Sequence, residues 1–383
     1  MRPEDFSATS SSRLLRSPEG FWCFVPAPLP PSLPPTWSLT KQLSEADRAV
    51  AELAGVGGML PNPHLLIGPF LRREAVLSSR IEGTMATVQQ LALFEVAGVQ
   101  QTYDESEVQN YVRALELGLE LLKELPISLR LIRRVHERLL AGVRGADKQP
   151  GEFRTRQNMI ASWRGQSPSD ALFVPPPVRQ METALHDLEQ YLHTESDMPL
   201  LIRLALIHYQ FEAIHPFMDG NGRMGRLLIT LVLCAERYLP QPLLYLSAYF
   251  EQHRDAYMNH LLLVSQIGAW EEWISFFLGG VTEQARDAVR RSQRLIELQH
   301  TYREALQSPR GSSLPIKLAE HLFATPAMTA PLATRILKVT PRAAQLTIDK
   351  LVSAGILRLN PDFAHPRVYV CDEIIEVIQA ERF

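Results

Sequence analysis

The sequence predicts a mainly α-helical protein with a β-hairpin, and three observations support this fold class. Apolar residues recur at helical spacing over most of residues 44–305, which is typical of helices with one buried face. Prolines and glycines interrupt this spacing where helices are expected to end. Residues 151–177 instead carry short apolar runs, a turn sequence and a triple proline, which indicates two short strands.

Composition narrows the class of protein further. The 383 residues are 46% hydrophobic and 21% charged, which are ordinary values for a globular chain of about two or three domains. A net charge of −3 argues against a polyanion-binding surface over the whole chain. The N-terminus has no apolar signal core, and the longest apolar run, residues 227–235, is too short to span a membrane. We therefore expect no membrane association.

The cysteines indicate the type of cellular compartment. Cys23, Cys234 and Cys371 lie far apart in apolar surroundings and show no metal-ligand spacing. Unpaired cysteines of this kind are typical of a reducing compartment. The sequence therefore predicts a soluble, cytoplasmic protein.

The first predicted elements are an extended segment and then helices. Prolines cluster over residues 26–35, and because proline lacks an amide donor and fixes φ, this stretch is expected to be extended chain on the surface. Residues 44–56 start with a serine cap and predict a helix. Residues 67–81 predict another, with Pro69 near its start and Gly83 placed to end it. Two amphipathic helices are predicted next, over residues 105–125 and 128–142.

Beyond Pro150 the predicted strands of residues 151–177 meet in a turn at residues 165–169. Helices then resume, and residues 199–214, behind Asp197 as the expected N-cap, are apolar on nearly all sides, as in a buried central helix. The predicted helices of this part cover residues 178–193, 199–214, 221–236, 247–266, 271–279 and 281–305. The last of them is interpreted as a connecting or dimerising helix, or equally as a solvated strut.

Residues 215–226 form the motif with the most chemical content, His-Pro-Phe-Met-Asp-Gly-Asn-Gly-Arg-Met-Gly-Arg. They lie between the apolar helix of residues 199–214 and an apolar run that starts a new helix. Gly220 and Gly222 allow backbone amides to approach a phosphate, at the point where a helix N-terminus offers unpaired N–H groups and a positive dipole end. The motif therefore predicts an anion-binding site.

The other polar residues of the motif suit phosphate chemistry. Asp219 can hold Mg²⁺, which usually takes only one or two carboxylates and keeps water and phosphate oxygens as further ligands. Arg223 and Arg226 supply forked donors for phosphate charge. His215, with an unperturbed pKa of about 6.5, can remove a proton from a hydroxyl near neutral pH. Together they predict a phosphoryl or nucleotidyl transfer site.

Each part of this motif has an ordinary structural explanation when it stands alone. A histidine beside proline is usually packed or capping, Asp-Gly-Asn-Gly is usually a tight turn, and two arginines at i, i+3 usually form a solvated helix face. Their concentration between two apolar helices favours the functional interpretation.

The motif of residues 215–226 resembles the signature of a known protein family. The string matches the H-P-F-x-D-G-N-G-R-x-x-R signature of the Fic family of protein adenylyltransferases without a departure. The likeness extends from about residue 21 to residue 281 and involves five more segments. GEFRTRQN with the later FVPPP is similar to the target-positioning flap of the family, PLLYLSAYFEQHRDAY and GAWEEWISFFLGGV are similar to its downstream helices, and EAVLSSRIEGT is similar to its inhibitory helix.

The resemblance implies transfer of AMP from ATP to a Ser, Thr or Tyr hydroxyl of a target protein, with self-modification expected. His215 would be the general base, and Asp219 would position Mg²⁺ or Mn²⁺. Asn221 and the glycine amides would hold the α-phosphate, whereas the two arginines would bind the β- and γ-phosphates. The nucleotide-binding set is then Gly220, Asn221, Gly222, Arg223, Gly225, Arg226 and Tyr257, where Tyr257 is an adenine-pocket candidate or, equally, a core residue. Phe217 is expected to anchor the loop, and the flap to bind the target by main-chain pairing.

An inhibitory switch is the next expectation from this resemblance. Ser78 and Glu82 are four residues apart, so they share one helix face, and Gly83 follows as a terminator. The Ser-x-x-x-Glu-Gly string is similar to the autoinhibitory motif of the family, in which Glu82 would pair with Arg226 and occupy the place of a γ-phosphate. The alternative is a set of polar residues on an exposed helix.

The C-terminal part predicts a separate small domain. Residues 339–357 resemble the recognition-helix segment of winged helix-turn-helix domains, with Thr340 as cap, Pro341 at the first helical position and Gly355 at the end. Residues 311–350 carry five basic and two acidic side chains, which suits weak DNA binding. Residues 351–383 carry three basic and five acidic ones, so protein contacts or homodimer formation are equally expected.

The predicted domains are an N-terminal helical region over residues 1–125, a catalytic core over 126–280, a connecting helix and linker over 281–310, and the winged helix-turn-helix domain over 311–383. Residues 307–313 (QSPRGSS) mark the clearest boundary. Two other hypotheses stay open. One is a DNA-binding regulator that senses a nucleotide, and the other is an enzyme of the same family that moves UMP or phosphate or removes AMP.

Overall fold

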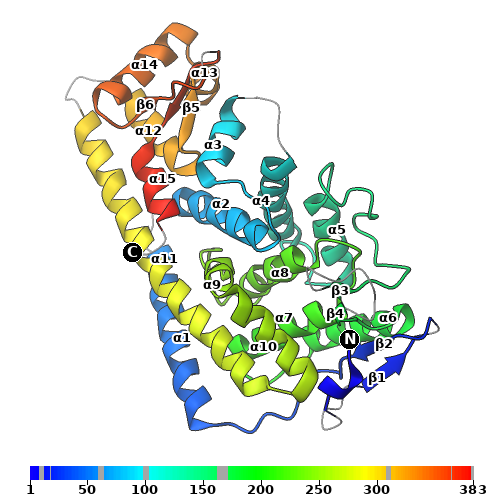
Figure 1. Cartoon of the computed structure of the whole chain (residues 1–383). Helices are drawn as coiled ribbons and strands as arrows, with labels where there is room; N and C mark the ends of the chain where they lie inside the picture. Colours follow the sequence, from blue (N-terminus) through cyan, green and yellow to red (C-terminus); the bar gives the residue numbers. More distant parts are fainter. Residues whose placement is uncertain are drawn as a thin grey trace. The chain divides into compact units, whose positions relative to one another are not determined.

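The computed structural model describes residues 1–7, 13–17, 19–58, 64–97, 103–161, 171–307, 312–363 and 365–380. The described chain is mainly helical with small antiparallel sheets (Figure 1), which confirms the predicted fold class. The helices are α1 (Trp37–Gly58), α2 (His64–Ile81), α3 (Val88–Ala97), α4 (Tyr103–Leu121), α5 (Leu129–Leu139), α6 (Val178–His193), α7 (Leu200–Ile214), α8 (Asn221–Ala235), α9 (Ser247–Gln252), α10 (Arg254–Ile267), α11 (Trp270–Leu306), α12 (Leu314–Ala324), α13 (Ala330–Leu337), α14 (Pro341–Ser353) and α15 (Asp372–Gln379), with a 3₁₀ turn at Pro3–Asp5. The strands are β1 (Arg13–Arg16), β2 (Trp22–Val25), β3 (Ile160–Ala161), β4 (Ala171–Phe173), β5 (Ala327–Thr329), β6 (Arg358–Leu359) and β7 (Val368–Val370).

The chain forms two compact units. Unit 1 comprises Met1–Val50, Arg113–Tyr238 and Leu246–Glu283. Unit 2 comprises Ala51–Val112, Leu239–Tyr245 and Gln284–Phe383. Within the described ranges, no helix has the length and apolar character that crossing a membrane requires.

Helix α7 forms the centre of unit 1, between α6 and α8 (Figure 1). Its sequence is apolar on nearly all sides, and every position from Leu204 to Phe211 is buried. The predicted buried central helix is therefore confirmed. The predicted cap at Asp197 is wrong, because the structure places Pro199 at the N-cap, where its fixed φ suits a helix start and its missing amide costs nothing.

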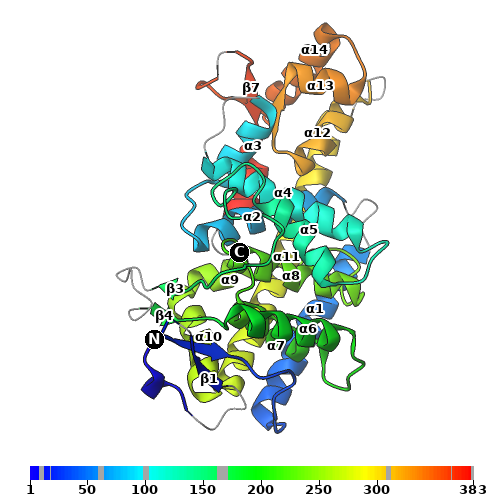
Figure 2. The ribbon, with the colours of Figure 1, turned by 90° about the vertical axis from the view of Figure 1, so that its right-hand side faces the viewer.

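Two antiparallel strand pairs lie side by side in unit 1 (Figure 2). The pair β3–β4 occupies the segment predicted as a hairpin, and its predicted turn at residues 165–169 lies outside the described residues. The pair β1–β2 was not predicted, because its strands are only four residues long and β2 ends directly before the proline cluster. The pairs meet where the amide of Phe24 donates to the carbonyl of Val174 at 2.9 Å.

Helix α11 is one continuous helix, whereas the sequence predicted a break near Gly279 and Gly280. The reason is packing, because a Cβ at Gly280 would lie 2.7 Å from the ring of Tyr249 on α9. Glycine therefore serves close helix contact here and does not end the helix. Conversely, the single helix predicted over residues 247–266 is broken at His253 into α9 and α10.

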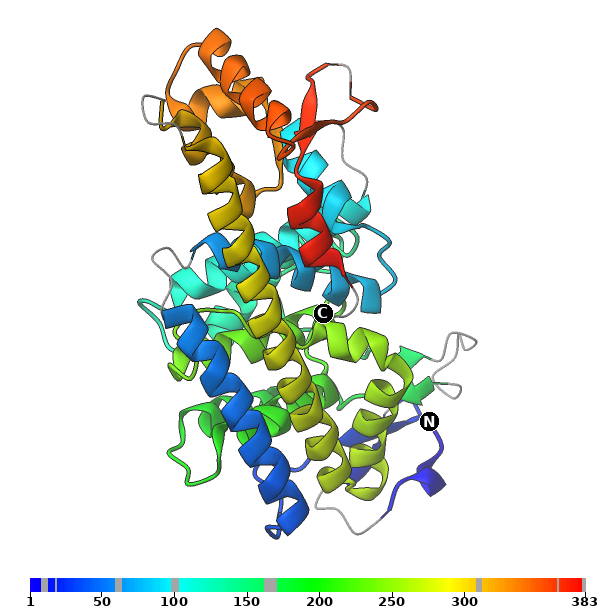
Figure 3. The ribbon, with the colours of Figure 1, turned by 90° about the vertical axis from the view of Figure 1, so that its left-hand side faces the viewer.

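Helix α1 begins seven residues before the predicted start, at Trp37 instead of residue 44. The hydroxyl of Thr36 accepts a hydrogen bond from the amide of Leu39 at 3.2 Å, which caps the first turn. Hydrogen bonds from Thr36 to Glu271 at 2.8 Å and from Ser275 to Gln42 at 2.6 Å join α1 to the first turns of α11 (Figure 3).

In unit 2, helices α12 to α14 and the strands β5–β7–β6 gather beside α3 (Figure 1). Apolar residues of α3, the sheet and α15 form one core: Ala92, Ala97, Ala327, Val368, Val370 and Ile375. Helix α3 was not predicted, because it is apolar without a polar face and gives no amphipathic signal. The hydroxyl of Thr340 caps α14 as predicted, through the amide of Ala343 at 3.3 Å. The winged helix-turn-helix assignment stays a prediction, as does DNA binding.

Candidate active site

The predicted motif forms the loop between α7 and α8. His215 follows the last residue of α7 in the left-handed conformation, with φ 49° and ψ 61°. This conformation costs an L-residue about 1–2 kcal/mol. It turns the chain out of α7, so that residues 216–220 pass directly into the N-terminus of α8.

The imidazole of His215 has a preferred tautomer. Its Nδ1 lies 3.3 Å from the carbonyl oxygen of Glu212, and because a carbonyl only accepts, Nδ1 carries the proton in this contact. The other ring nitrogen, Nε2, is then the unprotonated one in the neutral ring. The side chain is half-buried.

Asn221 closes the loop from within. Its Oδ1 accepts from the amide of Phe217 and its Nδ2 donates to the carbonyl of the same residue, both at 2.8 Å. The Asn221 side chain is buried, and both of its polar groups are used in this contact. The structure therefore places Asn221 as a brace of the loop.

His136 of α5 supports the loop from the other side. Its ring stacks on Phe217, with centroids 3.6 Å apart and planes 4° apart. Its Nε2 lies 2.9 Å from the carbonyl of Asp219, and its Nδ1 accepts from the amide of Gly151 at 2.9 Å. Both contacts are met by the neutral Nε2–H tautomer, and burial lowers the pKa of His136 to about 4.

The His136 contacts predict a loss of stability in mild acid. Because the folded pKa of about 4 lies below the unfolded value, His136 stabilises the fold fully above about pH 6.5, and this stabilisation falls as the pH drops towards 4. Between about pH 7 and about pH 5 the loss is about 2 kcal/mol. Denaturant unfolding of the protein and of His136→Gln at both pH values measures it, and we expect a smaller loss in the variant.

The control for this measurement is His186→Gln, which replaces an exposed histidine of α6 in the same unit. It should lose as much stability between the two pH values as the unchanged protein. Equal losses in all three proteins would contradict a neutral, buried His136.

The N-terminus of α8 has the features of an anion site. Gly220 is the N-cap, with φ 77°, and as a glycine it brings no side-chain acceptor to the first-turn amides. A Cβ there would lie 3.2 Å from Nε2 of His136. Arg223 and Arg226 follow on α8, and both are buried. Amides, the helix dipole and two guanidinium groups therefore concentrate positive charge at this helix end.

Asp219 is the carboxylate of the loop. Its Oδ1 accepts from the amide of Gly220 at 2.6 Å and lies 3.6 Å from Nη2 of Arg223, and its side chain is 35% exposed. A partly exposed carboxylate next to a helix N-terminus is a chemically suitable ligand for Mg²⁺. No group of three or more potential metal-ligating side chains occurs in the described part of the chain.

Gly225 is needed for packing between α7 and α8. A Cβ at this position would lie 3.2 Å from the ring of Phe211 and would also meet the carboxylate of Glu212, both near the end of α7. Glu212 is the residue whose carbonyl contacts the His215 ring. Glycine at position 225 therefore lets the end of α7 approach α8 closely enough to form the loop.

Tyr257 lies in the core of unit 1. Its side chain is 1% exposed, and its ring stacks on Phe250 at 4.4 Å. Its hydroxyl lies 2.8 Å from Nε2 of His208, whose Nδ1 lies 3.3 Å from the carbonyl of Gly225. Burial, with Arg226 as a second cause, lowers the pKa of His208 to about 3. Tyr257 thus connects to the motif through a buried histidine.

Ser78, Glu82 and Gly83 lie in unit 2, at the end of α2. Ser78 is buried, and Glu82 is the exposed residue after the helix. Gly83 has φ 92°, its amide donates to the carbonyl of Arg80 at 2.9 Å, and the amide of Thr84 donates to that of Ser79 at 3.1 Å. This is a Schellman ending, so the predicted role of Gly83 as a helix terminator is confirmed.

Sequence reasoning gave no role to several residues that shape this site. His136 is one apolar-face position of an amphipathic helix, and its sequence context carries no distinguishing signal. Gly145, with φ 90°, was also missed, although a Cβ there would lie 2.8 Å from Oδ2 of Asp219. Arg154 and Asn158 stand in the GEFRTRQN segment, whose density of polar residues was a usable signal.

The comparisons with known proteins agree with this geometry. Residues 40–120 match the model of the Fic/DOC family N-terminal region, and residues 126–233 match the model of the Fic/DOC family itself. The chain is therefore similar to the Fic/DOC family over both of these regions. Helices α7 and α8 and the loop between them lie in the second match.

Two curated relatives are both named protein adenylyltransferase Fic. The one from Drosophila willistoni is 28% identical over 212 residues, 52% of this chain and 39% of the relative. The one from Drosophila virilis is 32% identical over 126 residues, 32% of this chain and 24% of the relative. The chain thus spans well under half the length of these relatives.

Solved structures show the same fold. A Fic family protein from Desulfovibrio desulfuricans G20 has a TM-score of 0.55 at 20% identity, and the match covers 90% of this chain and 98% of that one. Fic-1 from C. elegans has a TM-score of 0.50 at 20% identity, over 68% of this chain and 74% of that one.

Proposed function

We propose that this chain transfers AMP from ATP to the hydroxyl group of a Ser, Thr or Tyr residue of a target protein, itself included. The loop between α7 and α8 carries the proposal, because it sets His215 beside a helix N-terminus with an uncapped, electropositive first turn. The name of the curated relatives, protein adenylyltransferase, supports the same reaction.

In this reaction Nε2 of His215 takes the proton of the target hydroxyl while the oxygen attacks the α-phosphorus. The bond from the α-phosphorus to the bridging oxygen breaks, and pyrophosphate leaves. The contact of Nδ1 with the carbonyl of Glu212 keeps the ring in the tautomer that can accept this proton.

The first-turn amides of α8 bind the phosphates, and Gly220 and Gly222 let them approach. Arg223 and Arg226 neutralise the β- and γ-phosphate charge. Asn221 acts by holding the loop, because its amide group is bonded to Phe217. Asp219 would hold Mg²⁺ or Mn²⁺, which supplies further charge neutralisation at the phosphates.

The activity is proposed to be autoinhibited. Glu82 follows the end of α2 as an exposed carboxylate, and its pairing with Arg226 would fill the place of the γ-phosphate. A phosphate can replace a carboxylate on an arginine, so Glu82 acts as a competitor of correctly bound ATP.

The target is proposed to bind along the β3–β4 pair by main-chain hydrogen bonds. Such pairing positions a hydroxyl without demanding much target sequence. It explains how one flap accepts Ser, Thr or Tyr.

The transferred group can be tested with ATP labelled at one phosphate. Glu82→Gly protein is incubated with Mg²⁺ and with ATP labelled at either the α- or the γ-phosphate. We expect protein-bound label only from the α-phosphate. Label from the γ-phosphate would identify phosphate transfer and overturn the proposal.

A further inference from the structure

Among the residues that the structure describes, the partners of the buried Arg154 side chain are main-chain carbonyls. Its side chain is 1% exposed, and within the described ranges no carboxylate lies at ion-pair distance from it. Its Nε donates to the carbonyl of His215 at 3.0 Å, Nη1 to that of Arg156 at 3.4 Å, and Nη2 to that of Pro176. Burial lowers its pKa to about 10, so the group stays charged near neutral pH.

Burying a guanidinium without a counterion is costly unless all its donors are used. Here the donors reach three places at once. Arg156 precedes β3 and Pro176 follows β4, so they mark the two ends, or roots, of the flap that the β3–β4 pair forms. The third place is the backbone of the base, His215, which is held in the left-handed conformation.

Asn158 also binds the backbone of the motif loop. Its Nδ2 donates to the carbonyl of His215 at 3.3 Å and to that of Phe217 at 2.8 Å. The amide of Arg154 also donates to the carbonyl of Pro216 at 2.9 Å. Residues 154–158 therefore bind three successive carbonyls of the motif loop.

We propose that Arg154 is a positioning residue, which fixes the direction of the His215 ring and holds both roots of the flap at a set place relative to it. The proposal rests on the proposed function. In that reaction Arg154 would keep the target hydroxyl, bound at the flap, at a fixed distance and direction from the base His215. It would do so without contacting ATP.

The test compares Arg154→Met and Arg154→Lys in the Glu82→Gly background. For Arg154→Met we expect the rate of self-modification at saturating ATP to fall about 100-fold, with an unchanged KM for ATP, because a displaced base slows chemistry and not nucleotide binding. Arg154→Lys should recover part of the rate, since an ammonium can donate to one of these carbonyls. A raised KM with unchanged kcat would overturn the proposal.

The matched control is Arg203→Met, which removes another buried arginine of unit 1, packed over the ring of Tyr191. It should leave the rate unchanged. A readout independent of activity is the ¹³Cε1 resonance of His215 in histidine-labelled protein, assigned by His215→Asn. It should shift in Arg154→Met and not in Arg203→Met. If the parent incorporates no AMP, the proposed function fails, whereas an unshifted resonance overturns the role of Arg154.

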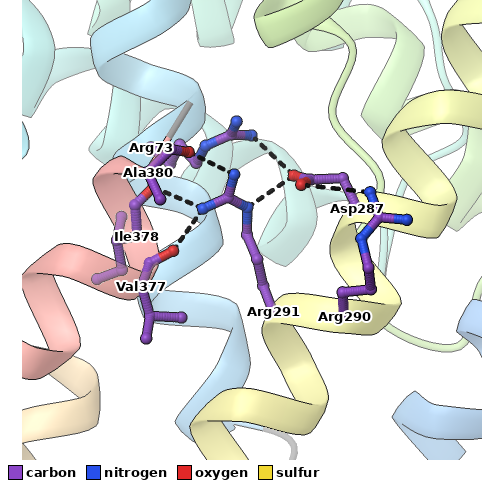
Figure 4. Close-up of polar contacts among 7 residues, drawn as sticks. All are labelled: Arg73, Asp287, Arg290, Arg291, Val377, Ile378 and Ala380. Atoms are coloured by element: carbon purple, nitrogen blue, oxygen red, sulfur yellow. Dashed lines mark hydrogen bonds and ion pairs between the residues drawn. The ribbon is translucent and has the colours of Figure 1, made fainter. Parts of the chain in front are cut away.

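A second, independent observation concerns helix α2 in unit 2 (Figure 4). Nη1 of Arg73 on α2 lies 3.6 Å from Oδ2 of Asp287 on α11, and the same oxygen accepts from Nε of Arg291 at 2.6 Å. Arg291 also donates to the carbonyls of Val377, of Ile378 at 3.3 Å and of Ala380 at 2.6 Å. These carbonyls end α15, where a helix needs donors.

Helix α2 has a neighbouring attachment. Arg72 donates to Oε2 of Glu95 on α3 at 2.9 Å and to the hydroxyl of Thr325, just after α12, at 3.3 Å. A Cβ at Gly68 would lie 3.1 Å from the carbonyl of Ala324. Arg72 is therefore bonded to α3 and to the C-cap of α12, and Arg73 pairs with Asp287 on α11. Ser78 lies only five residues beyond Arg73 on the same helix.

We infer that Arg291 couples the C-terminal helices to the inhibitory end of α2, so that any change that displaces α15 weakens inhibition by Glu82. This inference rests on the proposed autoinhibition. Arg291 is 1% exposed, and removing its side chain leaves the end of α15 and Asp287 without their shared donor.

The test is a double-mutant cycle of Arg291→Met with Glu82→Gly. Arg291→Met should raise AMP incorporation when Glu82 is present and add nothing when Glu82 is absent. Arg303→Met is the control, because it removes an exposed ion pair between α11 and α12, Arg303 with Glu320, and should change nothing. An equal effect of Arg291→Met in both backgrounds would contradict the coupling.

Asp287→Asn is the second variant, in case Arg291→Met does not fold. Hydrogen exchange gives a readout that needs no activity, and the amides of α2 should exchange faster in Arg291→Met than in Arg303→Met. Unchanged exchange overturns the coupling. An inactive Glu82→Gly parent overturns the proposed function alone.

Discussion

Replacing His215 is expected to abolish AMP incorporation in the Glu82→Gly background. A positioned general base contributes about 10²- to 10⁴-fold to such a step. Two variants are informative, His215→Ala and His215→Asn. Asparagine tolerates the left-handed conformation of this position, so its loss of activity reports the missing base and not a misfolded loop. Incorporation of labelled ATP into the purified protein measures the effect.

The control for this prediction is His186→Ala, which makes the same change at an exposed position of α6. It should retain full activity. If His215→Asn kept the rate of the parent, another group would be the base, and the tautomer argument from Glu212 would be wrong.

Glu82→Gly is expected to raise AMP incorporation by about 5- to 150-fold, the range of a typical coupling free energy between two sites. The physical reason is competition, because the carboxylate and the γ-phosphate would bind the same arginine. Initial rates of labelling at equal protein concentration measure it. Glu82→Gln should show most of the same rise, since it removes the charge and keeps the side-chain size.

Glu124→Gly is the matched control, an exposed glutamate in the turn after α4. Its rate should equal that of the unchanged protein. A rise in Glu82→Gly without one in Glu82→Gln would assign the effect to backbone freedom at the end of α2, and would contradict the proposed pairing with Arg226.

The local parts of the fold follow from the sequence. The bounds of α6 were predicted to the residue, and α8 begins at Asn221 as its glycine-rich start indicated. Gly83 ends α2 because only a left-handed residue closes that turn. In each case the signal is carried by neighbouring residues.

The missed parts depend on residues far apart in the chain. From the sequence alone, Gly280 favours a helix end. Only the packing of the Tyr249 ring against this position explains why glycine stands inside a continuous helix. His136 and Arg154 gain their roles only when α5 and residues 154–158 meet the loop of residues 215–221. The sequence could name the groups proposed to perform chemistry, but not the groups that hold the loop in place.

The most direct test is the intact mass of the Glu82→Gly protein after incubation with Mg²⁺ and an equal mixture of ATP, UTP, GTP and CTP. We predict an increase by whole multiples of one AMP, which disappears when His215→Asn is added. An increase by UMP or by phosphate, or the same increase without His215, would contradict AMP transfer by this site.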